Sequence, residues 1–156
     1  MIYLGADHGG FYLKEKIKKW LVEWNFAYED LGNKVYDPDD DYPRFALAVA
    51  QKVAGEEKKI KDKNLPWKEK PKGILLCRSA AGMVIAANRI KGVRAVAVFN
   101  VEMGKHSRLH NDANILALSG DHLEERTAQD ILKVWLDTEF SNEVRHQRRI
   151  KMLDEL

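Results

Sequence analysis

The sequence predicts an α/β fold: a single-domain, three-layer α/β/α sandwich of Rossmann-like type around a five-stranded parallel sheet. Strand-like apolar segments alternate with helix-like segments along the chain, which is typical of a parallel sheet covered on both faces by helices. The 156 residues suffice for one domain with its own core, and the single cysteine excludes an intrachain disulfide. No internal repeat is found, so residues 1–156 are expected to form one domain.

Five short segments rich in apolar residues are the expected strands. The second of them alternates apolar and polar residues, and the fourth is rich in β-branched residues. In chain order they are residues 2–6, 26–31, 73–77, 93–99 and 113–119. They are expected to run parallel because a helix-like segment separates each from the next.

Helix-like segments occupy the stretches between and after these strands. In the first, Leu13, Ile17 and Leu21 recur at helical spacing while lysines occupy the other face. Pro43 stands near the start of the second, where its missing N–H leaves no hydrogen bond unmade. The expected helices are residues 11–24, 41–54, 83–90, 101–109, 124–140 and 144–156.

A charged segment at about 55–72 interrupts the domain without dividing it. It contains seven lysines and four acidic residues, so its charge of +3 exceeds the +2 of the whole chain. We expect a solvated inserted loop, because a nucleic-acid-binding protein normally carries a broad basic face with interleaved aromatic residues. No nucleic-acid partner is therefore expected, although binding through this segment and the basic stretch 145–151 remains an alternative.

The chain shows no sign of a membrane or export segment. No apolar run approaches the roughly 20 residues that a membrane-spanning helix needs, so no membrane association is expected. The opening stretch MIYLGADHGG lacks the basic and apolar regions of a signal peptide. The cytoplasm is therefore the expected location.

Polar residues cluster at three strand ends. Asp7 and His8 follow the first strand, and Cys77 closes the third. His110 stands directly before the fifth strand. Open α/β sheets bind ligands at the carboxyl ends of their strands, so a site is expected there. Taken singly, Asp7 is at least as well explained as a helix N-cap, and a cysteine such as Cys77 is more often a small buried apolar residue than a nucleophile.

Neither a metal nor an organic cofactor is expected. His106 and His110 stand four residues apart, as a pair of metal ligands could, but no HExxH frame or thiolate cluster accompanies them. The glycines at 9 and 10 do not form the GxGxxG dinucleotide fingerprint, and no GxxxxGK[ST] phosphate loop is present.

Five stretches occur in one order along nearly the whole chain: GADHGGFYLK, DYP, GILLCRSAAGMVIAANRIKGVRA, HNDANILAL and RHQRR. In order and spacing they resemble the type B ribose-5-phosphate isomerases and their galactose-6-phosphate isomerase relatives. The resemblance implies an aldose–ketose isomerase of a phosphorylated sugar, with ribose 5-phosphate and ribulose 5-phosphate as the expected pair. It also implies a homodimer with shared active sites and no metal, and leaves open whether dimers pair into tetramers.

The resemblance implies four catalytic residues. Family members carry the base either as a cysteine at the position of Cys77 or as a glutamate at that of Met83, so the cysteine variant is implied here. Ser79 would stabilise an enediolate, His110 would open the furanose ring, and Asp7 would lie near the ring oxygen. The start of a helix beside Cys77 is expected to lower the pKa of its thiol from about 8.5.

A phosphate cage and sugar contacts complete the implied site. Arg145 and Arg149 lie four apart and share one helix face, from which their guanidinium groups can bind phosphate bidentately. Arg145 is expected to belong to the same chain as Cys77, and His110 to the partner. The implied substrate-binding residues, with Arg78 added for its place beside the base, are His8, Tyr42, Arg78, Gly82, Asn111, Arg145 and Arg149.

Two regions depart from the family pattern. Relatives usually read CGTGxG where this chain reads CRSAAG, so Arg78 and Ala80 replace glycines. If those glycines need a positive φ, Arg78 is strained or the turn is reshaped. Asp121 stands where relatives commonly carry an arginine that reaches phosphate, and Arg78 either compensates for that charge or points to solvent. The alternatives are an isomerase of another sugar phosphate, such as a hexose 6-phosphate, and a catalytically weakened sugar-phosphate binding protein.

Overall fold

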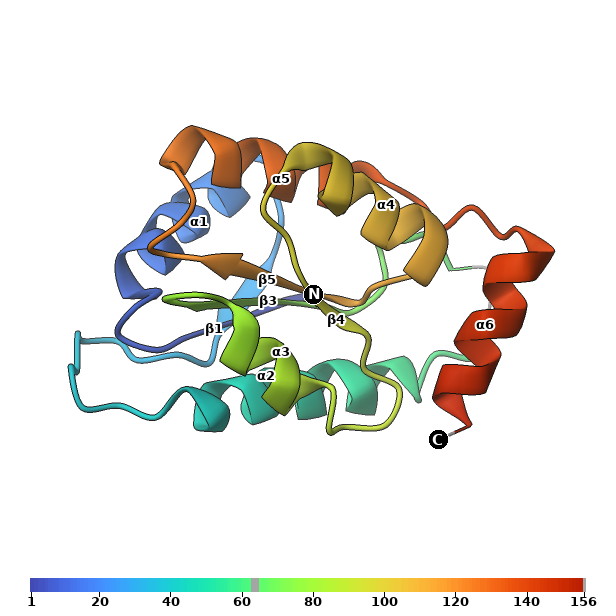
Figure 1. Ribbon diagram of the computed structural model, residues 1–156, viewed down its shortest axis with the longest axis horizontal. Coiled ribbons are helices and arrows are strands. Elements are labelled where there is room, and N and C mark those ends of the chain that lie inside the picture. Colours follow the sequence, from blue (N-terminus) through green and yellow to red (C-terminus); the bar gives the residue numbers. More distant parts are fainter. Residues whose placement is uncertain (63–64, 156) are drawn as a thin grey trace.

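A computed structural model describes residues 1–62 and 65–155 (Figure 1). Its five strands form one sheet in the order β2-β1-β3-β5-β4, in which neighbouring strands are parallel. The strands are β1 (Ile2–Ala6), β2 (Tyr28–Asp30), β3 (Lys72–Cys77), β4 (Ala95–Ala97) and β5 (Ile115–Ser119). The predicted α/β class with a five-stranded parallel sheet is confirmed.

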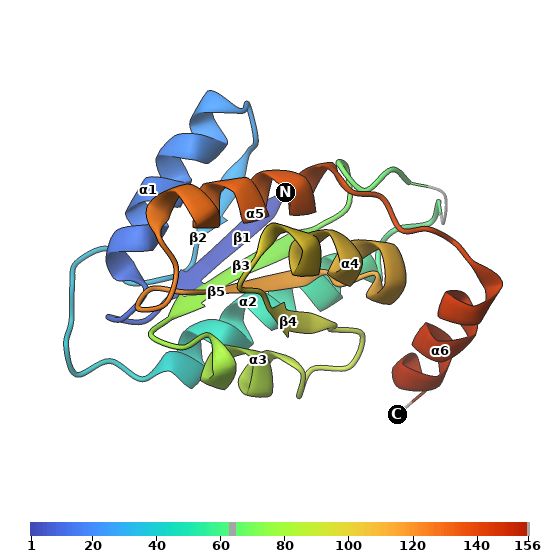
Figure 2. The ribbon, with the colours of Figure 1, turned by 45° about the horizontal axis from the view of Figure 1, so that its top comes forward.

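Helices cover both faces of this sheet (Figures 1 and 2). One face carries α1 (Phe11–Glu23), α4 (Val101–Asn111) and α5 (Glu125–Asp137). The other carries α2 (Tyr42–Glu57) and α3 (Ala81–Ala87). A last helix, α6 (Val144–Asp154), stands at one end of the sheet beside α4. Within the described ranges, no helix has both the length and the apolar composition needed to cross a membrane.

The central strand β3 is buried on both sides. Ile74 and Leu76 pack in the apolar cluster beneath α1 and α5, whereas Leu75 and Cys77 pack in the cluster beneath α2 and α3. Successive side chains of a strand point to opposite faces, so this division follows from the pleat. The side chain of Cys77 therefore points toward α3, the helix that directly follows its strand.

The start of α3 differs from the prediction. The helix begins at Ala81 rather than at residue 83, and Ala80 directly before it has a left-handed backbone with φ of +67°. Arg78 is not among the residues with positive φ. The backbone strain that a positive φ causes in a residue other than glycine is therefore found at Ala80 and not at Arg78. The other expected helices agree with the structure to within three residues at each end, except that residue 156 lies outside the described residues.

The charged segment 55–72 is not entirely the solvated loop that its composition predicts. Its first residues complete α2, and Lys72 begins β3. Trp67 is 2% exposed, forms a T-shaped contact with Trp135 and lies under the guanidinium of Arg108, 3.5 Å from the ring centroid. Lys72 is also buried, and this burial, followed by the charge of Arg108, lowers the pKa of its ammonium to about 7.

The expectation of a solvated loop is thus wrong for Trp67 and Lys72. The reason is that the aromatic ring finds apolar and cationic partners on α4 and α5, far away in the sequence. Residues 63–64 of this segment lie outside the described residues.

Candidate active site

Two neighbouring strands bring Asp7 and Cys77 together at the carboxyl edge of the sheet, which here means the side where the parallel strands end. β1 and β3 pair in register with Ala6 opposite Leu76, so the residues that follow are also adjacent. The backbone N–H of Asp7 continues the pairing by donating to the carbonyl of Leu76 (3.2 Å). Both side chains are buried, at 6% exposure for Asp7 and 5% for Cys77.

Cys77 is held at the first turn of α3. The N–H of Ala80 donates to its Sγ at 3.1 Å. Burial, the largest effect, raises the pKa of the Cys77 thiol, and the charge of Asp7 adds to the increase. The N–H groups of Met83, Ala80 and Ser79 lower the pKa but only partly offset the burial. The start of α3 thus acts in the predicted direction, but the predicted net decrease of the Cys77 pKa is wrong, because withdrawal from water outweighs the nearby N–H dipoles.

The carboxylate of Asp7 closes the turn between β1 and α1. Its Oδ1 accepts a hydrogen bond from the N–H of Gly10 at 3.1 Å. Gly10 itself, rather than Asp7, is the N-cap of α1, so the alternative of a simple helix cap does not describe Asp7. Burial raises the pKa of Asp7, against the opposing effect of the Gly10 N–H.

His8 is fixed by an acidic residue that the sequence reading missed. Both its backbone N–H and its ring Nδ1 lie within hydrogen-bond distance of Asp40 Oδ1, at 3.0 and 2.8 Å. Asn33 donates to the second oxygen of Asp40 at 2.6 Å. Asp7, His8 and Asp40 also have the spacing of metal ligands, the one such group of three among the described residues. Asp40 belongs to a run of aspartates that leads into the DYP motif, and nothing in the sequence distinguishes it from its acidic neighbours.

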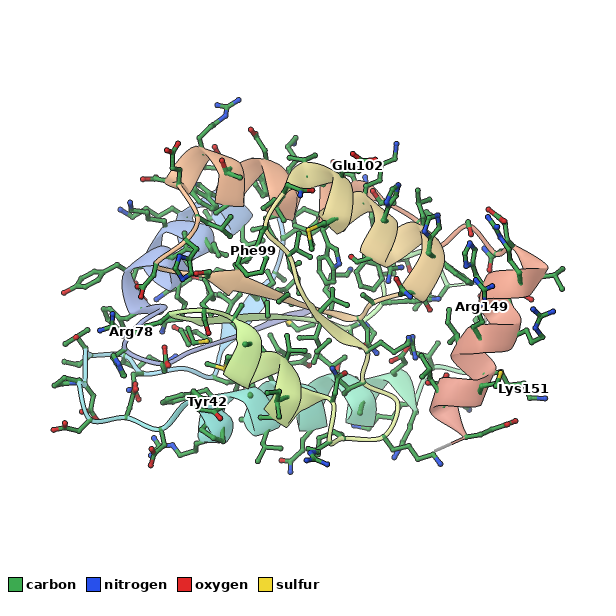
Figure 3. All side chains as sticks on the ribbon, viewed as in Figure 1. Tyr42, Arg78, Phe99, Glu102, Arg149 and Lys151 are labelled. Carbon is green, nitrogen blue, oxygen red and sulfur yellow. The ribbon has the colours of Figure 1, made fainter. Side chains whose placement is uncertain are left out.

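Tyr42 packs against the start of α3. A Cβ atom at Gly82 would lie 2.8 Å from the Tyr42 ring, so a side chain at position 82 would displace the ring. Tyr42 is 38% exposed and lies at the same end of the sheet as Arg78 (Figure 3), and the exposed Ser79 directly follows Arg78 in the chain. The structure therefore places Asp7, His8, Tyr42, Cys77, Ser79 and Gly82 at one edge.

Arg78 also belongs to this edge, where it pairs with Asp121. Its Nη1 lies 3.3 Å from Asp121 Oδ2, and both side chains are largely exposed. The backbone carbonyl of Arg78 accepts from the N–H of Asp121 (3.2 Å) and from the hydroxyl of Ser119. Its side chain lies so close over Gly9 that a Cβ there would meet Arg78 Cγ at 2.4 Å. The two departures from the family pattern thus contact each other.

The remaining predicted residues lie at the amino edge of the sheet, the side where the parallel strands begin. His110 and Asn111 end α4 and precede β5, which places them at the amino ends of the strands. Figure 3 shows Arg149 on α6 at this end, whereas Arg78 and Tyr42 lie at the other. A five-residue strand such as β5 spans on the order of 15 Å, so the two groups do not meet within one chain.

Arg145 lies with His110 rather than with Cys77. It is on α6, where its Nε donates to Glu143 at 2.8 Å, and the next residue, His146, stacks on the ring of His110 with centroids 4.6 Å apart. The expectation that one chain contributes Arg145 together with Cys77 does not fit this placement, because α6 packs against α4 at the amino edge.

Comparisons with known proteins match this fold over nearly its full length. A family model described as Ribose/Galactose Isomerase matches residues 2–153. Ribose-5-phosphate isomerase B of Mycobacterium tuberculosis (strain ATCC 25618 / H37Rv) is 34% identical over 154 residues, covering 99% of this chain and 88% of that protein. Ribose-5-phosphate isomerase B from Mycoplasma genitalium, solved with bound ribulose-5-phosphate, superposes with a TM-score of 0.88 at 34% identity, covering 99% of this chain and 93% of that chain.

A second solved structure, ribose 5-phosphate isomerase from Thermotoga maritima, gives a TM-score of 0.87 at 37% identity and covers 99% of this chain and 97% of that chain. The fold and these similarities define the class of the protein as an aldose–ketose isomerase of sugar phosphates. The chain belongs to the ribose/galactose isomerase family, as the order of its sequence motifs predicts.

Proposed function

We propose that this protein interconverts ribose 5-phosphate and ribulose 5-phosphate through an enediolate, with Cys77 as the base. The observation that carries the proposal is the placement of Cys77 and Asp7, which are buried side by side at the carboxyl edge of the sheet. No carboxylate is available at the alternative position of the family, because residue 83 is methionine. The names of the relatives, ribose-5-phosphate isomerase B, support the choice of substrate.

The proposed proton transfer conserves atoms and charge. The Cys77 thiolate takes the proton from carbon 2 of the open-chain aldose, and the resulting thiol returns it to carbon 1, while a proton moves from the oxygen on carbon 2 to that on carbon 1. The Ser79 hydroxyl and the N–H groups at the start of α3 would stabilise the enediolate oxygens. Asp7 would contact the ring oxygen and the sugar hydroxyls.

The raised pKa of Cys77 sets the pH dependence of this mechanism. Only the thiolate accepts a proton, so the rate is expected to rise with pH until the thiol is ionised. A thiolate of raised pKa is also the stronger base once formed. The first effect places the activity on the alkaline side of the profile expected for an ordinary cysteine, and the second raises the rate reached once the thiol is ionised.

We propose further that the active site is shared between two chains. His110, Asn111, Arg145 and Arg149 lie too far from Cys77 in one chain, and a second copy can bring its amino edge to the first chain's carboxyl edge. Large apolar side chains are exposed on α3, after the outermost strand β4 and at the start of α4, which supports burial of this side of the molecule against a partner. They are Ile85, Phe99, Val101 and Met103.

A panel of pentose and hexose phosphates tests the substrate and the base together. We expect turnover of ribose 5-phosphate, and a loss of about 10²- to 10⁴-fold in kcat in Cys77→Ala, because a general base contributes about that factor. Binding of the substrate to Cys77→Ala, measured by calorimetry, should remain. Faster turnover of a hexose 6-phosphate would reject the substrate, and near-normal turnover by Cys77→Ala would reject the base.

A further inference from the structure

Three histidine rings form a stack between α4 and α6. The rings of His106 and His110 have centroids 4.9 Å apart and an interplanar angle of 21°. His110 and His146 have centroids 4.6 Å apart at 15°. His110, proposed to open the sugar ring, is therefore covered on both faces by other imidazoles.

The ring of His110 has stacking contacts but no polar contacts among the described residues. Within the described parts of the chain, neither ring nitrogen of His110 makes a hydrogen bond or ion pair. His8 differs, because its Nδ1 lies 2.8 Å from Asp40 Oδ1. A histidine is usually oriented by a hydrogen bond to one of its nitrogens, which leaves only the other for chemistry. His110 instead has stacked rings beside it, and both of its ring nitrogens are without a hydrogen-bond partner among the described residues.

His146 is buried in a way that packing alone does not explain. The residue is 6% exposed, and its Nε2 is buried without a hydrogen-bond partner. Native proteins generally avoid such a group, and an apolar side chain of similar size would not leave a polar atom unpaired. The buried imidazole makes a contact that depends on its aromatic ring, with the parallel face of His110.

The charges around His146 favour its neutral form. Burial, followed by the positive charge of Arg145 and the proximity of His110, lowers the pKa of His146, and Arg149 acts in the same direction. Glu143 opposes them, with an oxygen 3.9 Å from Nε2. A neutral ring can stack on His110 whether or not His110 carries a proton, whereas two stacked cations repel each other.

We propose that His146, assisted by His106, is a positioning residue that holds the His110 ring in the plane required for opening the sugar ring. This inference rests on the proposed role of His110. His146 acts through its ring face and touches no substrate, since it is buried in its own chain behind His110. His106 covers the other face from an exposed position, so its contribution is the smaller one.

A matched pair of variants separates ring stacking from mere filling of space. His146→Phe keeps a flat aromatic ring against His110, and His146→Leu fills the space without one. We expect kcat with ribose 5-phosphate to fall about ten- to a hundred-fold in His146→Leu, because small misplacements of a reacting group have effects of that order. KM should change less than threefold, and His146→Phe should recover most of kcat.

Two controls accompany the pair. Arg148→Ala alters the same helix at a side chain that makes no hydrogen bond, ion pair or ring contact with the described residues, and is expected to leave kcat unchanged. His106→Leu, at a half-exposed ring, provides the test if His146→Leu fails to fold, with an expected loss of several-fold in kcat. Wild-type kcat in both leucine variants, or an equal loss in His146→Phe and His146→Leu, would overturn the inference.

A readout independent of catalysis is the NMR shift of the His110 ring protons. The flanking rings displace these resonances, so they should move toward the values of a free histidine in His146→Leu and remain displaced in His146→Phe. If the wild-type protein isomerised no sugar phosphate, the proposed function would be wrong. The ring-proton shifts would then still decide whether the stack fixes His110, and unchanged shifts in His146→Leu would reject it.

Discussion

The two edges of the sheet carry the two halves of the proposed site, and they are built differently. At the carboxyl edge, Asp7 and Cys77 are buried, and backbone N–H groups of the adjoining turns bind their side chains. At the amino edge, Arg145 and Arg149 are exposed, and the ring of His110 stacks with those of His106 and His146. On the proposed function, this difference means that one chain would prepare the proton-transfer chemistry, and a second chain would supply the residues for ring opening and phosphate binding from its amino edge.

The placement of the two halves of the proposed site at opposite edges fits the physical demands of proton transfer and of phosphate binding. Proton transfer at carbon needs a base held within about 0.5 Å of its productive position, and burial would restrict Cys77, the proposed base, accordingly. Phosphate binding by guanidinium groups acts over a longer range and tolerates mobile side chains. An exposed helix such as α6 can therefore deliver arginines to a neighbouring chain without belonging to that chain's core.

Mixing of inactive variants tests the division most strongly. Cys77→Ala damages the carboxyl-edge half and His110→Ala the amino-edge half, so a mixed dimer keeps one intact site of two. After subunit exchange, we expect about a quarter of wild-type activity, because half of the dimers are mixed and each has one site intact. The measurement is turnover of ribose 5-phosphate by the exchanged mixture, with exchange verified by mass spectrometry.

The placement of Arg145 supplies the control for that experiment. Because Arg145 lies at the same edge as His110, a mixture of Arg145→Ala and His110→Ala has no intact site and should stay inactive. A mixture of Arg145→Ala and Cys77→Ala should recover activity. Recovery in the first mixture and none in the second would mean that Arg145 works with Cys77 of its own chain, as the sequence reading expects.

The Arg78–Asp121 pair is expected to have a smaller effect, on binding. If Arg78 neutralises Asp121 near the bound phosphate, Arg78→Gly leaves an unpaired carboxylate and should weaken sugar-phosphate binding about tenfold. Asp121→Asn should tighten binding several-fold by freeing Arg78, and the double variant should return close to wild type. Calorimetric titration measures all three, and unchanged affinity in each would assign the pair to the solvated surface, where such pairs contribute little.

The smallest expected effect is on the ionisation of Cys77. The charge of Asp7 raises the pKa of Cys77, so Asp7→Asn should shift thiolate formation to lower pH, while burial keeps the pKa above that of an ordinary thiol. Ultraviolet absorbance of the thiolate measures the change, with Cys77→Ala as the blank, because the chain has a single cysteine. A titration curve that does not move would show that Asp7 is already protonated or too far away to act.

The strands and the order of the motifs could be predicted from the sequence because both are local. The apolar run 73–77 and the helix face of Leu13, Ile17 and Leu21 depend on neighbours a few residues away. Trp67 could not be placed in the same way, because it lies in a lysine-rich run and its partners Trp135 and Arg108 are distant in the sequence. The ionisation of Cys77 was predicted in the wrong direction because a helix start is visible in the sequence, while the depth of burial is not.

By itself, the sequence determined the parallel α/β architecture, the family and the residues expected to act, since alternating apolar segments and ordered motifs are properties of the linear chain. Only the tertiary structure decided how those residues are grouped. It brought Asp40 within hydrogen-bond distance of His8 and paired Arg78 with Asp121. It also stacked His146 on His110 and separated His110 from Cys77 by the length of a strand. The physical reason is that side-chain contacts across turns and helices depend on strand order and helix packing, which bring distant residues together and which no local pattern records.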